Sequence, residues 1–129
     1  IPNGILGLET RMPLLYSEGV LKGRITVNKF VELTSTNAAK AYGLHPRKGT
    51  VAIGADADLV IWDEREITIQ NSMLHHATDY TPYEGIALKA WPGMTLSAGK
   101  IVWDGKNFHP RSGQGRFLQC EAPSLLPKK

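Results

Sequence analysis

The hydrophobic pattern of the chain changes at Gly49, and this change limits the folds that are open to it. Before Gly49 apolar residues recur with the 3.6-residue period of helices, as in Val27, Phe30 and Val31. After Gly49 they alternate, or form short apolar runs typical of strands. A few short strands make a poor closed core. We therefore expect an α+β fragment whose sheet needs cover from helices or from strands outside this chain.

Three short helices are expected before Gly49, each bounded by a residue that suits a helix end. Threonine favours the first position, and glycine favours the position just after the last turn. The expected helices are residues 14–21, ended by Gly23; residues 27–34, capped by Thr26; and residues 37–42, capped by Thr36 and followed by Gly43.

The remainder of the chain predicts short antiparallel strands joined by turns. The apolar run at 58–63 lies between acidic residues and predicts a buried strand, and the segments 66–70 and 86–90 alternate. Residues 94–96 and 100–103 flank Ser-Ala-Gly and predict a hairpin, which is followed by a turn at Asp104-Gly105. Residues from 110 onward have no sustained period and are expected to form an extended tail.

Composition excludes several classes of function. The chain has 129 residues and a single cysteine, Cys120, so it has neither an internal disulfide nor a cysteine-based zinc cluster. The net charge is only +3 and the basic residues are scattered, so we expect no nucleic-acid partner. No apolar run approaches the roughly 20 residues that a membrane helix needs, so we expect no membrane partner.

The residue types that carry chemistry do not form a self-contained active site. The four histidines, His45, His75, His76 and His109, lack the His-x-His and His-x-x-x-His spacings that place two imidazoles on one face. We therefore expect no metal ligand in this chain, and surface or hydrogen-bonded histidines instead. Cys120 lies eleven residues from His109, in a segment without a predicted element, so nucleophilic catalysis is not expected there.

Two polar segments leave alternatives open. Asp56 and Asp58 are candidates for acid–base work, but acids at strand ends usually form turns, and Asp58 is expected to accept backbone N–H bonds from the Gly54–Asp56 turn. The segment Tyr80–Gly85 either lines a ligand pocket or forms an ordered loop whose tyrosine hydroxyls satisfy buried backbone groups.

Three stretches of the chain resemble one known family. They are Ile1-Pro2-Asn3-Gly4 with Gly7–Arg11; Asn37–Lys40 with Gly43-Leu44, Lys48–Thr50 and Gly54–Val60; and His75–Gly85 with Trp91-Pro92 and the hairpin ending at Trp103. Together they resemble the C-terminal part of the hydantoinase and dihydropyrimidinase family, cyclic amidohydrolases of the metal-dependent amidohydrolase superfamily. The second stretch is shared across the superfamily, whereas the first and third are specific to the hydantoinase branch.

The resemblance implies a fold and a division of the chain. Residues 1–45 would be the closing helices of a (β/α)8 barrel, whose active site lies at the C-terminal ends of its strands. Residues 46–107 would be the C-terminal half of a composite β-sandwich that is completed by strands of the N-terminal remainder of the enzyme. Residues 108–129 would be the extended tail.

The resemblance also implies chemistry for the complete enzyme. Two zinc ions would activate a bridging water that opens a hydantoin or dihydropyrimidine ring to an N-carbamoyl amino acid. The metal ligands would lie upstream of Ile1, so this chain alone is expected to hold no cofactor and to be inactive. Asn3 would contact the small cyclic amide substrate through its main chain, while Glu9 and Arg11 would be structural partners around that loop. A cytoplasmic homotetramer is expected by analogy.

Two other readings remain open. The chain could belong to the non-catalytic dihydropyrimidinase-like scaffold proteins, although their loop differs from Tyr80–Gly85. It could also exist as a free chain that acts only as an assembly module. The start at Ile1, without a methionine or a signal-peptide pattern, favours a piece cut from something longer.

Overall fold

The computed structural model describes residues 4–124, which form two compact units. The first unit comprises Ile1–Thr26 and Trp62–Pro92, and the second comprises Val27–Ile61 and Gly93–Lys129. The predicted boundaries after residues 45 and 107 divide the chain between a barrel and a β-sandwich. Both of these domains would be completed by segments outside this chain. These units do not test that division, which stays a prediction.

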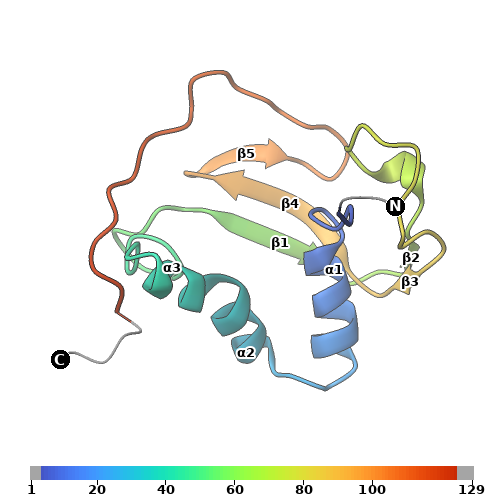
Figure 1. Cartoon of the computed structure of the whole chain (residues 1–129), viewed down its shortest axis with the longest axis horizontal. Helices are drawn as coiled ribbons and strands as arrows, with labels where there is room; N and C mark the ends of the chain where they lie inside the picture. The colour runs from blue at the N-terminus through green and yellow to red at the C-terminus, as the bar shows by residue number, and fades with distance from the viewer. Residues whose placement is uncertain (1–3, 125–129) are drawn as a thin grey trace. The chain divides into compact units, whose positions relative to one another are not determined.

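The helix of the first unit begins earlier than predicted and changes its winding partway. Helix α1 (Arg11–Leu15) passes without a break into the π-helical turns of η1 (Tyr16–Leu21), seen as one blue coil in Figure 1. Pro13 is tolerated in α1 because the first turn of a helix has no internal partner for its N–H. The helix stops before Gly23, which has φ +69°, so the predicted end is confirmed.

An aromatic pair joins this helix to the segment that follows residue 61. The rings of Tyr16 and Trp62 stack with centroids 4.7 Å apart and planes inclined by 8°. The Tyr16 hydroxyl donates a hydrogen bond to Glu64 Oε1 at 3.2 Å. Burial, and then the neighbouring Glu64 carboxylate, raise the pKa of Tyr16 above its ordinary value.

The core of the first unit lies beside a small antiparallel ribbon. Strand β2 (Ile67–Thr68) pairs with β3 (Ala87–Leu88), with Ile67 opposite Leu88. The 3₁₀ turn η3 (Asn71–Met73) lies between them along the chain. The buried core consists of Ile69, Leu74, Leu88 and Trp91, with Leu14, Ile67, Met73 and Tyr83 packed against it. The alternating segments predicted at 66–70 and 86–90 are therefore confirmed as strands, in shorter form.

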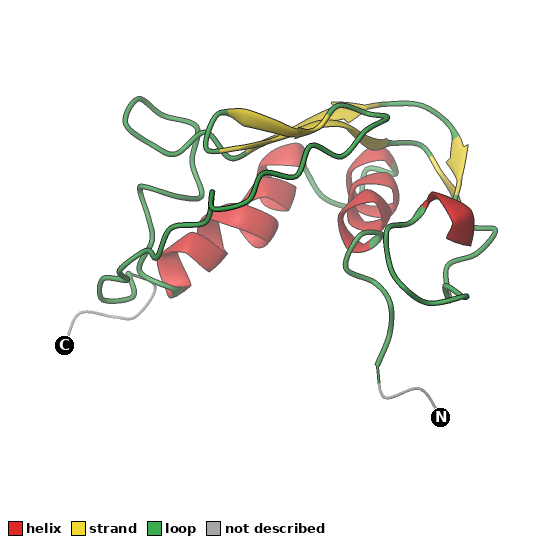
Figure 2. Ribbon diagram, turned by 90° about the horizontal axis from the view of Figure 1, so that it is seen from above, coloured by secondary structure: helices red, strands yellow, loops and turns green. Residues whose placement is uncertain are grey.

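The second unit contains one helical run where the sequence predicts two helices. Its parts are α2 (Val27–Val31), η2 (Glu32–Thr36) and α3 (Asn37–Ala41), which follow one another directly (Figures 1 and 2). The prediction that Thr36 caps a separate helix is wrong, because Thr36 is itself helical, with φ −62° and ψ −46°. Its hydroxyl instead donates to the Gly49 carbonyl at 2.7 Å. Gly43, at φ +65°, follows the last turn as predicted.

A three-stranded sheet has the order β1-β4-β5. Its strands are β1 (Leu59–Asp63), β4 (Trp91–Ser97) and β5 (Lys100–Trp103). Strands β4 and β5 form the predicted hairpin: Ser97 pairs with Lys100, and Ala98 and Gly99 occupy the turn with positive φ. Strand β1 is confirmed, but its burial is not. Val60 and Ile61 are about half exposed, because an apolar run becomes buried only where a second layer covers it.

The chain beyond β5 is irregular in the described part. A bridge joins Trp103 to Phe108, and residues 110–124 contain neither helix nor strand (Figure 2). Glu121 N donates to the Gly43 carbonyl at 2.9 Å, and Ser124 N donates to the Lys40 carbonyl at 3.1 Å. These backbone contacts hold the end of the described tail against the C-terminus of α3.

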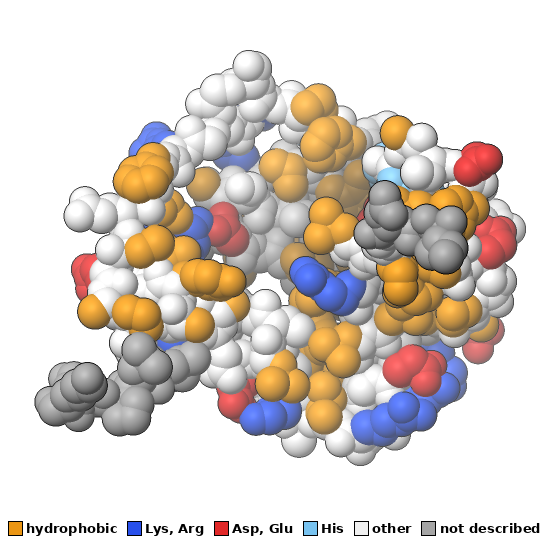
Figure 3. Space-filling view, in the orientation of Figure 1, with side chains coloured by type: hydrophobic (Ala, Val, Ile, Leu, Met, Phe, Trp, Pro, Cys, Tyr) orange, Lys and Arg blue, Asp and Glu red, His pale blue; other side chains and the backbone are white. Residues whose placement is uncertain are grey.

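Many large apolar side chains are exposed. Figure 3 shows apolar side chains on the surface of the viewed face. Those most exposed to solvent are Ile5, Leu8, Tyr42, Val51, Ile53, Phe108 and Phe117. Within residues 4–124, no helix combines the length and apolarity required to cross a bilayer.

Candidate functional site

The most distinctive polar arrangement in the first unit surrounds the loop that leads into α1. Gly7 N donates to the Ile5 carbonyl at 3.0 Å, and Arg11 N donates to the Gly7 carbonyl at 2.9 Å. These bonds fold residues 5–11 into consecutive turns. Glu9 therefore lies on a short, hydrogen-bonded segment that starts close to the Asn3-Gly4 motif in the sequence.

Glu9 joins this loop to a second loop 66 positions later in the chain. Its Oε2 accepts the backbone N–H of His75 at 2.8 Å, and its Oε1 lies 2.9 Å from His75 Nδ1. A carboxylate oxygen only accepts hydrogen bonds, so Nδ1 carries the proton that it shares with Glu9. Both carboxylate oxygens are thus directed at one residue.

Gly7 and Tyr83 bring the two loops close together at a second point. A Cβ placed on Gly7 would lie 3.2 Å from Tyr83 Oη and 3.5 Å from Tyr83 Cε2. Tyr83 in turn packs against the core of the first unit. Gly7 therefore lies beside a side chain that packs against the core.

The second loop is closed by its own hydrogen bonds. Glu84 Oε2 accepts the Asn71 backbone N–H at 2.6 Å, and Gly85 N donates to the Ile69 carbonyl at 2.9 Å. His76 Nδ1 and Thr78 Oγ1 lie 2.6 Å apart. The loop carrying His75 is therefore ordered, as the ordered-loop alternative for Tyr80–Gly85 expects. These hydrogen bonds do not involve the hydroxyls of Tyr80 or Tyr83, so the part of that alternative that assigns them to buried backbone groups stays a prediction.

The same loop also borders an open cavity of about 560 Å³. Its lining residues are Gln70, Asn71, Ser72, Asp79, Tyr80, Thr81 and Glu84. Within the described chain, the buried atoms Asn71 Oδ1 and His76 Nε2 have no hydrogen-bond partner, nor does Thr10 Oγ1 in the first loop. The pocket alternative for Tyr80–Gly85 thus has a geometric counterpart, although no ligand identifies it.

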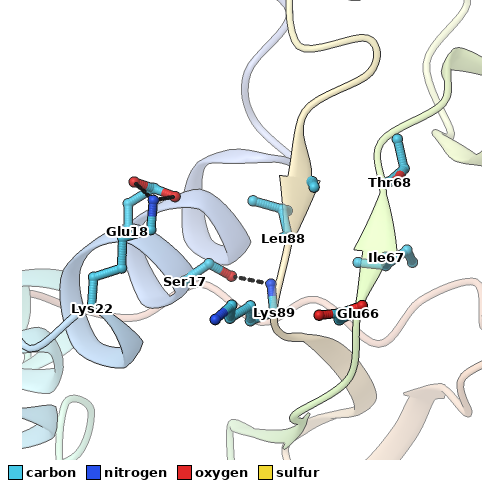
Figure 4. Close-up of a pocket in the computed structure, with 9 residues that line it drawn as sticks. Ser17, Glu18, Lys22, Glu66, Ile67, Thr68, Leu88 and Lys89 are labelled. Carbon is cyan, nitrogen blue, oxygen red and sulfur yellow. Dashed lines mark hydrogen bonds and ion pairs between the residues drawn. The ribbon is translucent and has the colours of Figure 1, made fainter.

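A second pocket in the first unit lies between η1 and the β2–β3 ribbon (Figure 4). Ser17 Oγ accepts the Lys89 backbone N–H at 3.1 Å, so the buried hydroxyl ties the helix to the end of β3. Glu18 faces Lys22 at 2.8 Å, and that hydrogen bond lowers the pKa of Glu18. The Glu18–Lys22 contact in this pocket is thus an exposed ion pair on the surface of η1.

The acidic pair Asp56 and Asp58 belongs to a charge cluster of the second unit. Lys48 is ion-paired to both carboxylates, and its hydrogen bond to Asp58 is the main cause that raises the pKa of Lys48. Burial works to raise the pKa of Asp58, but hydrogen bonds from Lys48 and from the Ala98 N–H lower it overall. Asp58 therefore accepts a backbone bond, but from the β4–β5 turn and not from the predicted Gly54–Asp56 turn.

The remaining candidates are separated from one another. His109 Nε2 lies 2.8 Å from Asp104 Oδ2, and the exposed Cys120 has its Sγ 4.0 Å from the Leu118 carbonyl. Within residues 4–124, no three His, Cys, Asp or Glu side chains converge as a metal site would require. Asn3, the predicted substrate contact, lies outside the described residues.

Sequence reasoning named Glu9 as a structural partner and His75 as a hydrogen-bonded or surface histidine, but it did not pair them. No helical or strand period connects residues so far apart in the sequence, so their pairing could not be predicted from the sequence. Arg11 enters the loop through its backbone N–H, as described above.

Comparisons with known proteins place this arrangement in context. Residues 1–102 match the model of the amidohydrolase family. The chain is 43% identical to the D-hydantoinase of Ralstonia pickettii, over 92% of this chain and 26% of that protein. It is 42% identical to the dihydropyrimidinase of Rattus norvegicus, over 92% of this chain and 23% of that protein.

Solved structures give the same picture. A D-hydantoinase (dihydropyrimidinase) from Thermus sp. matches with a TM-score of 0.88 and 41% identity, over 98% of this chain and 28% of that one. An L-hydantoinase (dihydropyrimidinase) from Arthrobacter aurescens matches with a TM-score of 0.83 and 34% identity, over 89% of this chain and 26% of that one. The chain spans about a quarter of the length of these relatives. Because the family model covers most of its residues, the chain belongs to the amidohydrolase family.

Proposed function

We propose that this chain is the C-terminal segment of a cyclic amidohydrolase that opens hydantoin or dihydropyrimidine rings by hydrolysis to N-carbamoyl amino acids. The observation that carries the proposal is the similarity over nine-tenths of the chain to proteins named D-hydantoinase and dihydropyrimidinase. The activity belongs to the complete enzyme.

The proposed place of the chain in that enzyme is the one that the resemblance to the hydantoinase family implies. Residues 1–45 would close the (β/α)8 barrel, residues 46–107 would form the C-terminal half of a composite β-sandwich, and residues 108–129 would form the tail. The exposed apolar residues of strand β1 support this arrangement, since they need a covering layer. That layer would come from the N-terminal remainder of the enzyme.

The proposed contribution of this chain to the active site is recognition of the ring. The Asn3 main chain would contact the amide edge of the substrate, and Gly4, which lacks a side chain, would allow close approach. The hydrogen-bonded turns of residues 5–11 support this role, because they order the segment between Gly4 and α1.

Metal chemistry would be supplied from elsewhere in the polypeptide. We propose two zinc ions in the complete enzyme, but the described side chains do not form a donor set that fits them. As the resemblance implies, their ligands would lie upstream of Ile1. A homotetramer in the cytoplasm completes the proposal, by analogy with the family.

The test uses the full-length protein and three substrates: hydantoin, 5-phenylhydantoin and dihydrouracil. Liquid chromatography would follow formation of the N-carbamoyl amino acid after the protein is loaded with zinc. We expect turnover of at least one substrate by the full-length protein and none by residues 1–129 alone. A folded, metal-loaded protein that opens none of the three rings would refute the proposed activity.

A further inference from the structure

We propose that the contact between Glu9 and His75 is a clasp that makes two loops of the first unit, residues 5–11 and residues 70–85, open and close together. The clasp is a conformational device built into this part of the fold. It does not depend on the activity proposed above, and its test needs no substrate.

The clasp joins the two loops through both oxygens of one carboxylate. Glu9 Oε2 accepts the His75 backbone N–H at 2.8 Å, and Glu9 Oε1 lies 2.9 Å from His75 Nδ1. A single hydrogen bond lets a side chain pivot about it, whereas two bonds to the same residue hold both its distance and its orientation. Because one of the bonds involves the His75 main chain, Glu9 holds the backbone of the second loop and not only a side chain.

Each loop is also closed by hydrogen bonds of its own. In the first loop, Arg11 N donates to the Gly7 carbonyl at 2.9 Å. In the second loop, Glu84 Oε2 accepts the Asn71 backbone N–H at 2.6 Å. A loop that is closed in this way moves largely as one body. A bond made at one of its residues therefore restrains the rest of the loop as well.

The clasp connects the first loop to a segment that packs on the core. Leu74, directly before His75, belongs to the buried core of the first unit, and Tyr83 packs against that core. Gly7 lies beside Tyr83, since a Cβ on Gly7 would be 3.2 Å from Tyr83 Oη. The two loops thus meet at a second point, which favours their opening as one unit.

The exposure of the clasp suits it to local opening and not to global stability. The side chains of Glu9 and His75 are 35% and 58% exposed, and exposed pairs contribute little to the free energy of global unfolding. Local opening requires much less free energy than global unfolding, so a weak contact changes its frequency. The loss of two hydrogen bonds to a carboxylate, discounted for this exposure, predicts about a tenfold increase in opening.

The clasp also bears on the open cavity of about 560 Å³ described above. Asp79, Tyr80 and Thr81 line that cavity and lie on the second loop. When the loop opens, these side chains move with it. The shape of the cavity therefore depends on the state of the clasp.

The test compares hydrogen–deuterium exchange in four full-length proteins: wild type, Glu9→Ala, Glu9→Gln and a control, Glu18→Ala. Glu18 is matched to Glu9 in exposure, at 37%, and is paired with Lys22 on η1. Peptides covering residues 5–12 and 70–86 report the two loops. A peptide covering residues 94–103, in strands β4 and β5, reports the second unit.

Single amides, resolved by electron-transfer fragmentation, separate the opening of the second loop from the loss of one bond. The His75 amide loses its acceptor directly when Glu9 is replaced. The Asn71 and Gly85 amides keep their own acceptors, Glu84 Oε2 and the Ile69 carbonyl. Faster exchange at Asn71 and Gly85 therefore reports opening of the loop itself.

In Glu9→Ala we expect exchange to speed up about tenfold in both loop peptides, including the Asn71 and Gly85 amides, because both loops share one open state. Glu9→Gln should be intermediate, since its amide oxygen can accept the His75 N–H and its NH₂ can donate to the neutral ring. Glu18→Ala should match wild type in both loop peptides. Exchange in the 94–103 peptide should be the same in all four proteins.

Faster exchange confined to the first loop, or to the His75 amide, would overturn the coupling of the two loops. Wild-type exchange in Glu9→Ala, or a Gln variant that exchanges as fast as the Ala variant, would overturn it too. An equal rise in the 94–103 peptide would show general destabilisation and no clasp. Should Glu9→Ala not fold, Glu9→Asp takes its place: its side chain is too short to keep both bonds, so both loops should exchange faster, and unchanged exchange would overturn the inference.

Discussion

At the scale of single residues, Asp104 shows how one carboxylate organises a turn. It accepts the backbone N–H groups of Asn107 and Lys106 at 2.7 and 2.9 Å, and it faces His109 Nε2 at 2.8 Å. The Asn107 N–H, followed by His109 and then the Lys106 N–H, holds the pKa of Asp104 far below its ordinary range. The turn predicted at Asp104-Gly105 therefore depends on the charged form of this side chain.

This shift predicts a dependence of stability on pH. Because the folded pKa is depressed, the stabilisation is fully present above the unfolded pKa of about 3.9 and is lost as the pH falls below it toward the folded pKa. Asp104→Asn keeps an acceptor oxygen but not the charge, so it resembles the protonated acid. We expect it to lower Tm at pH 7, and we expect the difference in Tm from wild type to begin to narrow as the pH falls below about 4.

Differential scanning fluorimetry from pH 7 to pH 3 would measure the difference in Tm. Asp79→Asn, which changes an exposed carboxylate on another loop, is the control. A difference between wild type and Asp104→Asn that stays constant across this range would show that the charge is not responsible.

At the scale of elements, the helices and the hairpin were largely predictable and their environment was not. The end of α3 at Gly43 and the turn at Ser97-Ala98-Gly99 were predictable from the sequence, because glycine adopts positive φ readily. The prediction that Thr36 caps a helix was wrong because threonine favours a helix start. Here its hydroxyl instead bonds the carbonyl of Gly49, which lies thirteen residues away in the sequence. Burial of β1 was not readable either, since it depends on a covering layer and not on the strand.

Thr36 gives a test of that corrected role. Thr36→Val removes the donor to the Gly49 carbonyl and should destabilise the full-length protein by about 1 kcal/mol, a typical value for one hydrogen bond. Thr36→Ser should retain most of the stability. Urea unfolding measures both, with Thr34→Val as the control because the Thr34 hydroxyl bonds the Phe30 carbonyl inside its own helix. Equal losses at both threonines would argue against a special tie to Gly49.

The β4–β5 turn is open to improvement. Ala98 occupies the first turn position with φ +48°, a conformation that costs a non-glycine residue about 1 kcal/mol. Asparagine tolerates this conformation and, followed by glycine, is the preferred two-residue hairpin turn. We expect Ala98→Asn to raise stability by about 0.5–1 kcal/mol in urea unfolding. Ala52→Asn, at another exposed alanine, should have no such effect, and a destabilised Ala98→Asn would contradict the turn assignment.

At the scale of the whole molecule, the sequence predicted an incomplete structure more readily than a site. The small number of strands already indicated missing cover, and the exposed apolar residues agree with it. The hydrogen bonds between Glu9 and His75 were not predictable, because they join two loops that are 66 positions apart and share no helical or strand period. Local patterns encode elements, whereas the site depends on loops that only the assembled fold brings together.

This incompleteness leads to the last prediction. Ile53, Phe117 and Val51 are at least 84% exposed in the described chain, and apolar surface of this extent is normally covered by a partner surface. Residues 1–129 expressed alone should therefore bind the dye ANS strongly and self-associate at micromolar concentration. The full-length protein should bind less dye per molecule, because its remaining segments cover the same surface. Dye fluorescence and light scattering compare the two, and a monomeric fragment with no excess fluorescence would mean that these faces need no cover.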